Sequence, residues 1–250
     1  MPLGLTDTHR PPGAHVALGA VLCFVAGAIN AGGFLAVGMY TSHMSGVVSS
    51  MADHLVLGHG VLLWIGFGSL MAFVGGAMTT AMMVRWALRR HLRSAFGRPL
   101  LVEALLLLVF GLFGAAIDAR SVALVPYTVV LLCFIMGLQN ALITQKSNAE
   151  IRTTHITGLV TDIGIELGHL FYINRHFPES SRVRANRQKL KMHVTLLLSF
   201  IAGAVCGAWG FKSLGYSATV PLALVLVALV YKPLVFDFDN WLSQWKSRKP

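Results

Sequence analysis

The sequence predicts an all-α integral membrane protein with six transmembrane helices, arranged as two inverted three-span repeats. Each repeat has an extra short amphipathic or re-entrant helix after its first span. Three observations predict this fold: an apolar composition, long runs without charged side chains, and a polar motif that occurs twice. Only 12% of the 250 residues are charged, and the mean hydropathy is +0.68. A soluble domain carries about 25% charged residues, so the composition excludes an ordinary soluble protein.

Six apolar stretches are long enough to cross the hydrocarbon core of a bilayer, which is about 30 Å thick and needs about 20 helical residues. Backbone groups in lipid must satisfy their own hydrogen bonds, so continuous apolar runs indicate helices. The third stretch crosses if Glu103 lies at the level of the lipid headgroups. The expected spans are about 16–38, 61–85 and 100–117 in the first repeat, and about 121–144, 194–212 and 214–232 in the second.

These spans define the expected organisation of the chain. No cleavable signal peptide is apparent, because the first apolar run is long enough to stay as a membrane anchor. The predicted segments are a cytoplasmic N-terminal tail (1–15), membrane repeat 1 (16–118), membrane repeat 2 (119–235) and a cytoplasmic C-terminal tail (236–250).

Two further segments, 42–57 and 154–171, are too short or too polar to be assigned as spans. Their apolar residues recur at helical spacing, which predicts amphipathic helices. If neither crosses fully, every Lys and Arg except Arg120 and Lys212 lies on the cytoplasmic side, whereas two more crossings divide the basic residues far more evenly. The positive-inside rule therefore favours six spans with both termini cytoplasmic. Whether the short helices re-enter the membrane or lie on it stays open.

The repeated motif lies in or beside the first span of each half. Asn30-Ala31 in the first half is matched by Asn140-Ala141 in the second, and a Thr-x-His-x-x-Gly pattern comes after each pair. The two patterns read Thr41-Ser42-His43-Met44-Ser45-Gly46 and Thr153-Thr154-His155-Ile156-Thr157-Gly158. Because each half has three spans, the two copies enter the membrane in opposite orientations. Inverted repeats of this kind are typical of secondary transporters.

The second spans of the two halves also match, although more weakly. Phe73 and Gly76 correspond to Phe200 and Gly203 in the second half. Gly203 also begins a Gly-x-x-x-Gly pattern that ends at Gly207. Small residues at this spacing allow membrane helices to approach closely, so we interpret these glycines as packing positions.

The paired motifs resemble those of the YoaK family, small bacterial integral membrane proteins of unknown function. The residues that carry the resemblance are Gly27-Ala-Ile-Asn30-Ala31 with Thr41-Ser-His43, and Gly137-Leu-Gln-Asn140-Ala141 with Thr153-Thr-His155. The similarity extends over most of the chain after the expected N-terminal tail. It implies a six-spanning protein of the bacterial inner (plasma) membrane, and the six spans agree with the charge distribution. It implies no substrate, cofactor or catalytic residue.

Asn30 and Asn140 lie deep in the first span of each half. An amide without a partner in hydrocarbon costs several kcal/mol. One interpretation is that both make interhelical hydrogen bonds, which are worth roughly 0.6–2 kcal/mol. The other is that both line a polar cavity, as their matched positions favour.

His43 and His155 follow hydroxyl residues that are good N-caps, namely Thr41-Ser42 and Thr153-Thr154. Each motif is thus predicted to begin a short helix whose free N–H groups form an anion site. If both helices re-enter the membrane, these N-termini meet near the midplane, where the imidazoles bind a solute or move protons. The alternative is two capped helices at the membrane surface, with both histidines at headgroup level.

Asp162 and Glu166 occur only in the second copy, where the first copy has Ser50 and His54. If buried, they are candidates for proton or ion coupling, because ionisable residues at membrane depth are generally functional. If exposed, they form an ordinary solvated helix face.

The favoured function is a secondary transporter or permease for a small polar or anionic solute. The alternative is a non-transporting membrane scaffold or sensor; an enzyme using His43 or His155 as base is least favoured, because no nucleophile or metal set accompanies either histidine. The predicted substrate-binding residues are Asn30, Thr41, Ser42, His43, Ser45, Asn140, Thr153, Thr154, His155 and Thr157.

The expected partners are the lipid bilayer and the solute, with a homo-oligomer left open. The net charge of +10 comes from basic clusters in loops beside the spans. Such clusters set topology and attract anionic lipid, so we expect no nucleic-acid partner. We expect no catalytic residue, cofactor or metal, since neither the cysteines nor the histidines have metal-site spacing.

Overall fold

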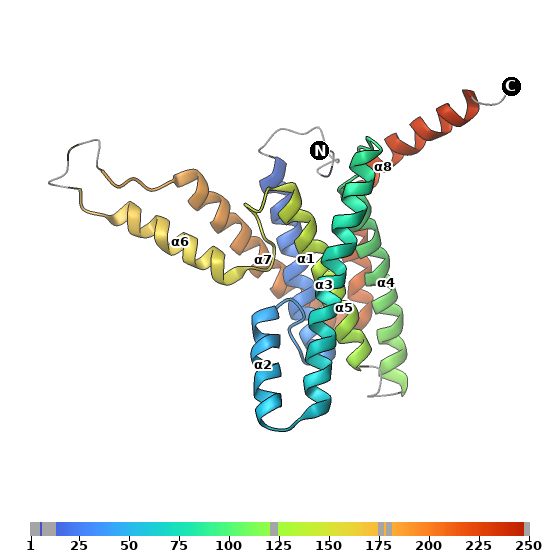
Figure 1. Cartoon of the computed structure of the whole chain (residues 1–250), viewed down its shortest axis with the longest axis horizontal. Helices are drawn as coiled ribbons and strands as arrows, with labels where there is room; N and C mark the ends of the chain where they lie inside the picture. Colours follow the sequence, from blue (N-terminus) through green and yellow to red (C-terminus); the bar gives the residue numbers. More distant parts are fainter. Residues whose placement is uncertain (1–5, 7–13, 121–124, 175–177, 179–181, 248–250) are drawn as a thin grey trace.

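The computed structural model describes residues 6, 14–120, 125–174, 178 and 182–247, and all the regular structure in these ranges is helical (Figure 1). Residues 121–124, at the start of one expected span, and most of the expected N-terminal tail lie outside the described residues. The helices are α1 (Ala14–Val37), α2 (Met44–Val56), α3 (Gly60–Arg89), α4 (Gly97–Arg120), α5 (Val125–Lys146), α6 (Ile156–Phe171), α7 (Arg187–Leu214), the 3₁₀ helix η3 (Gly215–Ala218) and α8 (Thr219–Ser247).

Four stretches of the described residues are long and apolar enough to cross a membrane: His15–Leu35, Gly60–Arg89, Pro126–Lys146 and Arg187–Ser243. The last stretch contains both α7 and most of α8. The all-helical membrane class is therefore confirmed, while the count of six spans and the inverted repeat stay predictions. The short amphipathic segments are helices as expected, since α2 and α6 cover most of the ranges 42–57 and 154–171.

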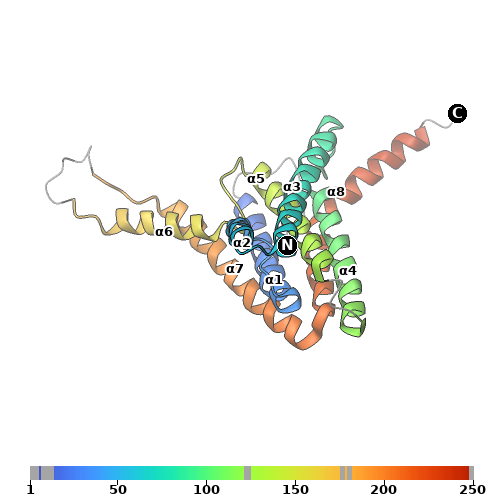
Figure 2. The same cartoon turned by 60° about the horizontal axis from the view of Figure 1, so that its bottom comes forward.

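The most extensive helix packing joins the two halves of the chain, while the short helices α2 and α6 pack within their own halves on α3 and α7. α1 lies along α7, α3 lies along α5, and α4 packs on α8 (Figures 1 and 2). The first long helix of each half thus pairs with the second long helix of the other half. The buried core lies between them and is formed by side chains of both halves, such as Leu22, Leu107, Leu132 and Leu196.

Glycines permit these close pairings. A Cβ atom on Gly27 would collide with the carbonyl oxygen of Phe200, and one on Gly203 with that of Phe24. The other pair repeats this contact, because a Cβ on Gly76 would meet the carbonyl oxygen of Phe134, and one on Gly137 that of Phe73. The prediction that Gly76, Gly203 and Gly207 are packing positions is confirmed.

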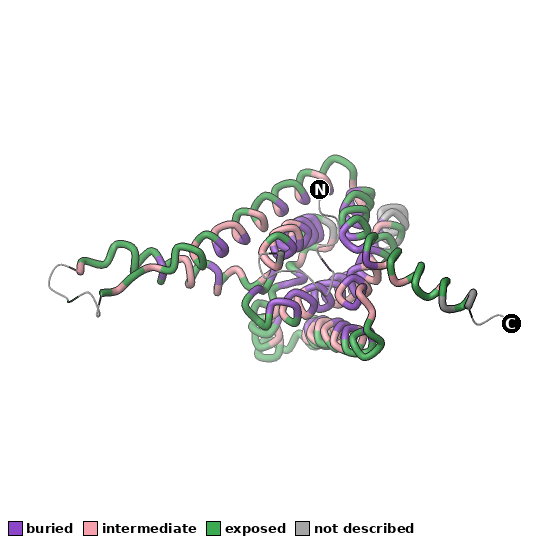
Figure 3. The backbone as a smooth tube through the Cα atoms, turned by 90° about the horizontal axis from the view of Figure 1, so that it is seen from above, coloured by how far each residue is buried: buried purple, intermediate pink, exposed green. Residues whose placement is uncertain are grey.

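The outer surfaces suit a lipid environment. α3 exposes large apolar side chains along one face: Trp64, Phe67, Met71, Val74, Met78 and Met82. An exposed apolar stripe of this length is foreign to a soluble monomer and marks a membrane or protein contact. α6 and the last turns of α8 extend away from the bundle and are largely exposed (Figure 3).

Glu103 is an acidic residue enclosed in the helix bundle. Its side chain is fully buried in α4, and neither carboxylate oxygen has a hydrogen-bond partner among the described residues. The sequence made headgroup level the condition for the third span to cross, and that condition stays a prediction. The structure adds that helix packing encloses the side chain within the bundle.

Candidate functional site

In the first half, Asn30 connects α1 to the segment before α2. Its side-chain oxygen Oδ1 accepts hydrogen bonds from the Ser42 hydroxyl at 2.8 Å and from the Ser42 backbone N–H at 3.3 Å. Asn30 and Ser42 are both buried. The chain leaves α1 at Val37 and is thus drawn back toward that helix before α2 begins.

The second half uses the same arrangement. Asn140 Oδ1 accepts hydrogen bonds from the hydroxyls of Thr153 at 3.2 Å and Thr154 at 3.0 Å, while its Nδ2 donates to the Met136 carbonyl at 2.9 Å. These bonds join each motif to the first helix of its own half. A buried amide costs free energy unless it is paired, and both asparagines have these partners.

The predicted N-caps are wrong. The residues at the cap positions are His43 and His155, and neither forms a side-chain capping bond. Ser42 and Thr154 direct their hydroxyls to the asparagines instead. The helical hydrogen bonds begin at the N–H groups of Val47 and Leu159, so the N–H groups of residues 44–46 and 156–158 precede the helical ladder.

The starts of α2 and α6 face each other across an open cleft of about 590 Å³, to which we refer as the motif cleft. Both histidines line it, although they come from opposite halves of the chain. Its other lining residues include Ser42, Ser45, Asn140, Thr154 and Thr157. A second cleft of about 490 Å³ shares Ser42, His43, Thr154 and Thr157 with it and adds Asn30.

Thr41 and Thr153 are the predicted substrate-binding residues that line neither cleft. Thr153 is fully buried with its hydroxyl bonded to Asn140, and Thr41 is 1% exposed. Both therefore lie behind the cleft wall. The other eight predicted substrate-binding residues are brought together around the two clefts.

Sequence reasoning missed Arg152, which lines the motif cleft. It immediately precedes Thr153, and the matching position of the first half is Tyr40, which stacks on Phe34 at 4.4 Å between ring centroids. A charged residue directly before a membrane motif was the available signal. Among the described residues that line the two clefts there is no Asp or Glu, so Arg152 gives the site a positive charge.

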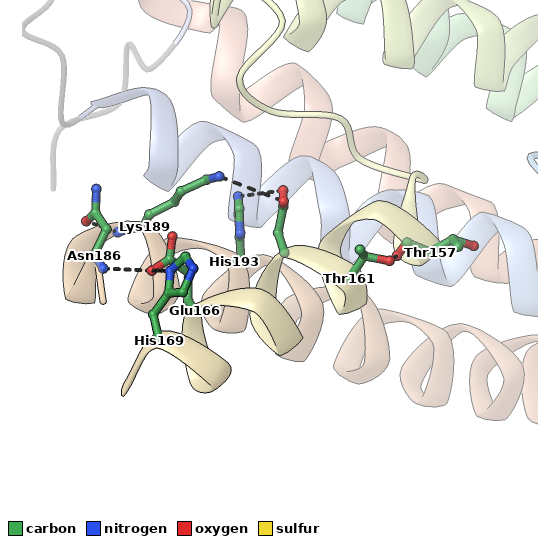
Figure 4. A network of polar contacts seen from close by, with 8 residues as sticks. Thr157, Thr161, Glu166, His169, Asn186, Lys189 and His193 are labelled. Atoms are coloured by element: carbon green, nitrogen blue, oxygen red, sulfur yellow. Dashed lines mark hydrogen bonds and ion pairs between the residues drawn. The ribbon is translucent and has the colours of Figure 1, made fainter. Parts of the chain in front are cut away.

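Asp162 and Glu166 lie outside the motif cleft, and both face the beginning of α7. Figure 4 shows Glu166 beside Asn186 at this junction. Glu166 is buried, and its Oε2 accepts the backbone N–H of Asn186, the N-cap of α7, at 2.7 Å. The imidazole of His169 lies 3.8 Å from the same oxygen. Glu166 therefore connects the end of α6 to the beginning of α7.

Asp162 is half-exposed and faces two basic side chains of α7, a lysine and a histidine. Its carboxylate lies 3.8 Å from Lys189 Nζ and 3.7 Å from His193 Nε2 (Figure 4). His193 is only 3% exposed. Asp162, His193 and His155 line a cavity of about 260 Å³, so His155 lies between this cavity and the motif cleft. No local pattern pointed to His193, because its partner comes from another helix.

Comparison with known proteins places the chain in a membrane-protein family. A family model described as "Protein of unknown function (DUF1275)" matches residues 18–231. The chain belongs to this family. It is also similar to the UPF0700 transmembrane protein YoaK of Bacillus subtilis (strain 168), with 27% identity over 158 residues, which cover 61% of this chain and 68% of that protein. No solved structure matches.

The DUF1275 match includes both motifs and all the residues that line the motif cleft. It confirms the resemblance drawn from the sequence. Among the described residues of this family member, no group of three or more His, Cys, Asp or Glu side chains is placed to hold a metal ion.

Proposed function

We propose that this DUF1275 member is a secondary transporter or permease for a small polar or anionic solute in the bacterial inner membrane. One observation carries the proposal: two matched motifs from opposite halves of the chain line a single cleft that contains Arg152 and no carboxylate among its described residues. A site built twice from matched polar residues is typical of transporters with internal repeats.

An anionic group is the ligand that this chemistry fits best. The N-termini of α2 and α6 carry partial positive charge and free N–H groups at the cleft. Arg152 supplies a guanidinium that forms two parallel hydrogen bonds with a carboxylate or phosphate. His43 and His155, with the hydroxyls of Ser45 and Thr157, complete the donors on the two sides.

The proposed architecture has six spans in two inverted repeats, with both termini cytoplasmic. The helix pairing between the halves supports it, because the first long helix of each half packs on the second long helix of the other: α1 on α7, and α5 on α3. The matched glycine contacts, of Gly27 with Phe200 and of Gly137 with Phe73, also support it. α1 begins and α8 ends on the same side of the bundle (Figure 1). Rocking of one repeat against the other would then expose the motif cleft alternately to each side.

Asp162 is the stronger coupling candidate of the two acids. It lies beside His193 and near His155, and a small cavity adjoins all three. In this role it would exchange a proton with His155 through water in that cavity. Glu166 remains in the proposal as a positioning residue at the junction of α6 and α7, because its Oε2 is engaged by Asn186.

A non-transporting scaffold or sensor is the second candidate. The hydrogen bonds from Ser42 to Asn30 and from Thr154 to Asn140 favour it, since they give part of each motif a structural role. The bilayer is a partner in either function, and the solute is a partner of the transporter. A homo-oligomer is compatible with both functions. Neither function involves an enzymatic step, a cofactor or nucleic acid.

Flux measurements decide between the two candidates. Purified protein would be screened by thermal shift against inorganic phosphate, nitrate and small carboxylates, and the stabilising anions would be tested for flux in liposomes. We expect the double variant His43→Ala/His155→Ala to lose flux, while His54→Ala/His59→Ala, which removes two imidazoles outside the cleft, retains it. If no anion is transported and the His43/His155 variant only lowers the melting temperature, the scaffold function replaces the transporter.

A further inference from the structure

A separate cleft of about 600 Å³ lies where α3 ends, α4 begins and α8 leaves the bundle. Its wall includes Trp86, Arg90 and Arg98 from one side and Phe238 and Trp241 of α8 from the other. It shares no residue with the motif cleft. Nothing in the proposed transport function uses it.

Two guanidinium groups are held at this cleft. The Cζ atoms of Arg90 and Arg98 lie 4.8 Å and 5.1 Å from the centroid of the Trp86 ring, and Arg98 Nε donates a hydrogen bond to Ser94 Oγ at 3.1 Å. Such cation–π contacts restrain the side chains without neutralising them. Within the part of the chain that the structure describes, neither guanidinium has an ion-pair partner.

Asp237 is the acidic group in the wall, and its carboxylate is occupied. Its Oδ1 accepts the backbone N–H of Arg93 at 3.0 Å, and its Oδ2 accepts the N–H and hydroxyl of Ser94 at 2.8 Å and 2.6 Å. These bonds fix α8 to the turn between α3 and α4. They direct the carboxylate to the donors of that turn, so Arg90 and Arg98 keep their charge available for another anion.

The aromatic residues place this cleft at a membrane interface. α8 contains Pro233, and beyond it the helix departs from the bundle with Phe238 and Trp241 exposed (Figure 1). Trp residues gather where hydrocarbon meets the headgroups, and an amphipathic helix with aromatic residues lies in that plane. The expected C-terminal tail thus continues the last helix as far as Ser247.

We propose that this cleft binds the headgroup of an anionic phospholipid. Arg90 and Arg98 bind the phosphate oxygens, and Phe238 and Trp241 contact the glycerol backbone and the first methylene groups of the acyl chains. A lipid fits better than a soluble phosphate, because charged and aromatic groups line the same cleft at the ends of apolar helices. The bound lipid would tie the end of α8 to the start of α4.

The test is lipid binding by the purified full-length protein, measured by native mass spectrometry and by quenching of Trp fluorescence with brominated phosphatidylglycerol. The variant Arg90→Gln/Arg98→Gln should bind phosphatidylglycerol about tenfold more weakly, as expected for loss of a charge-assisted bond. Arg85→Gln/Arg89→Gln removes the same charge from exposed positions on α3 and should bind as the wild type does. Phosphatidylcholine should bind weakly to all three proteins.

Two outcomes overturn the proposal. Equal loss of phosphatidylglycerol binding in both double variants means that only net charge matters. Equally tight binding of soluble glycerol phosphate means that the site is not specific for lipid. Arg90→Lys/Arg98→Lys keeps the charge and should retain most of the lipid binding. Retained binding would show that substitution at these two positions does not by itself disrupt folding. Because this assay requires no transport, its result is independent of the motif cleft.

Discussion

The two motif regions have the same framework and different chemistry. In each, an asparagine of the first helix accepts hydrogen bonds from the hydroxyl residues before the short helix, and a histidine occupies the cap position of that helix without a side-chain bond. The first region, however, has Tyr40 stacked on Phe34 where the second places Arg152 in the cleft. The shared residues set the backbone path, whereas the cleft's charge is found in the second copy.

The two short helices differ in the same way. α2 packs on α3 through apolar side chains such as Met51 against Gly66. α6 packs on α7 with polar contacts from Asp162 and Glu166. The comparison indicates that matched residues of both halves line the cleft, whereas the Arg152 guanidinium and the carboxylates of Asp162 and Glu166 are found in the second half alone.

The largest expected effect tests the shared framework. Gly76→Ala places a Cβ against the backbone carbonyl of Phe134, which cannot move without separating α3 from α5. Overpacking costs about 1–3 kcal/mol, and we expect about 3 kcal/mol here because the obstacle is backbone. Gly203→Ala in the other half should cost as much, since its Cβ meets the Phe24 carbonyl. Thermal unfolding in detergent measures both.

Gly75→Ala is the matched control, because its Cβ would lie 3.7 Å from the Phe134 ring, an ordinary contact. It should leave the melting temperature almost unchanged. Similar losses in the Gly75 and Gly76 variants would show that the close approach of α3 and α5 does not limit stability.

The second prediction tests the charge difference between the two halves by removing it. Arg152→Gln removes the guanidinium from the motif cleft. A charge-assisted bond is worth about 1.5–3 kcal/mol, so anion affinity should fall about 10- to 100-fold. Tyr40→Phe, at the matching position, should change it less than about threefold. Affinity is measured by the thermal shift with the transported anion, and an equal effect of both variants contradicts the asymmetry.

The third prediction compares the two asparagines. Asn30→Ala leaves the buried Ser42 hydroxyl and N–H without an acceptor, at a cost of about 1–3 kcal/mol. Asn140→Ala also leaves a buried hydroxyl, that of Thr153, without its acceptor. It should still cost less, because no backbone N–H loses its acceptor and the partly buried Thr154 hydroxyl can turn toward water. Gln145→Ala is the control: Gln145 is exposed on α5, so its replacement should leave the melting temperature almost unchanged. Thermal unfolding measures all three, and a larger loss from Asn140→Ala would contradict this order.

The sequence predicted the framework better than the site's chemistry. Apolar periodicity located α2 and α6 closely. The structure brings the starts of these two helices to shared clefts, while the prediction that they re-enter the membrane and meet near its midplane stays a prediction. The N-caps were mispredicted because local hydroxyl–backbone bonding competes with a tertiary acceptor, Asn30 or Asn140, that spacing does not reveal. The contacts of His193 and the burial of Glu103 depend on which helix faces pack together, and no local pattern encodes that.

The smallest effect concerns how His155 is held. A Cβ on Gly158 would collide with the His155 imidazole, whereas one on Gly46 would lie 3.8 Å from His43 Cβ. Gly158→Ala should therefore move the His155 ring and lower anion affinity about threefold, which is roughly 0.6 kcal/mol. Gly46→Ala should leave affinity unchanged and gain up to about 1 kcal/mol of helix propensity.

Histidine modification by diethyl pyrocarbonate, followed by peptide mass spectrometry, reports the position of each ring directly. Labelling of His155 should change in the Gly158 variant, because the added methyl group displaces the imidazole against which it would lie. Labelling of His43 should not change in the Gly46 variant, where the added methyl group makes only an ordinary contact. Equal labelling of His155 in the wild type and Gly158→Ala would mean that this glycine does not position the imidazole, and the two histidines would then be held alike.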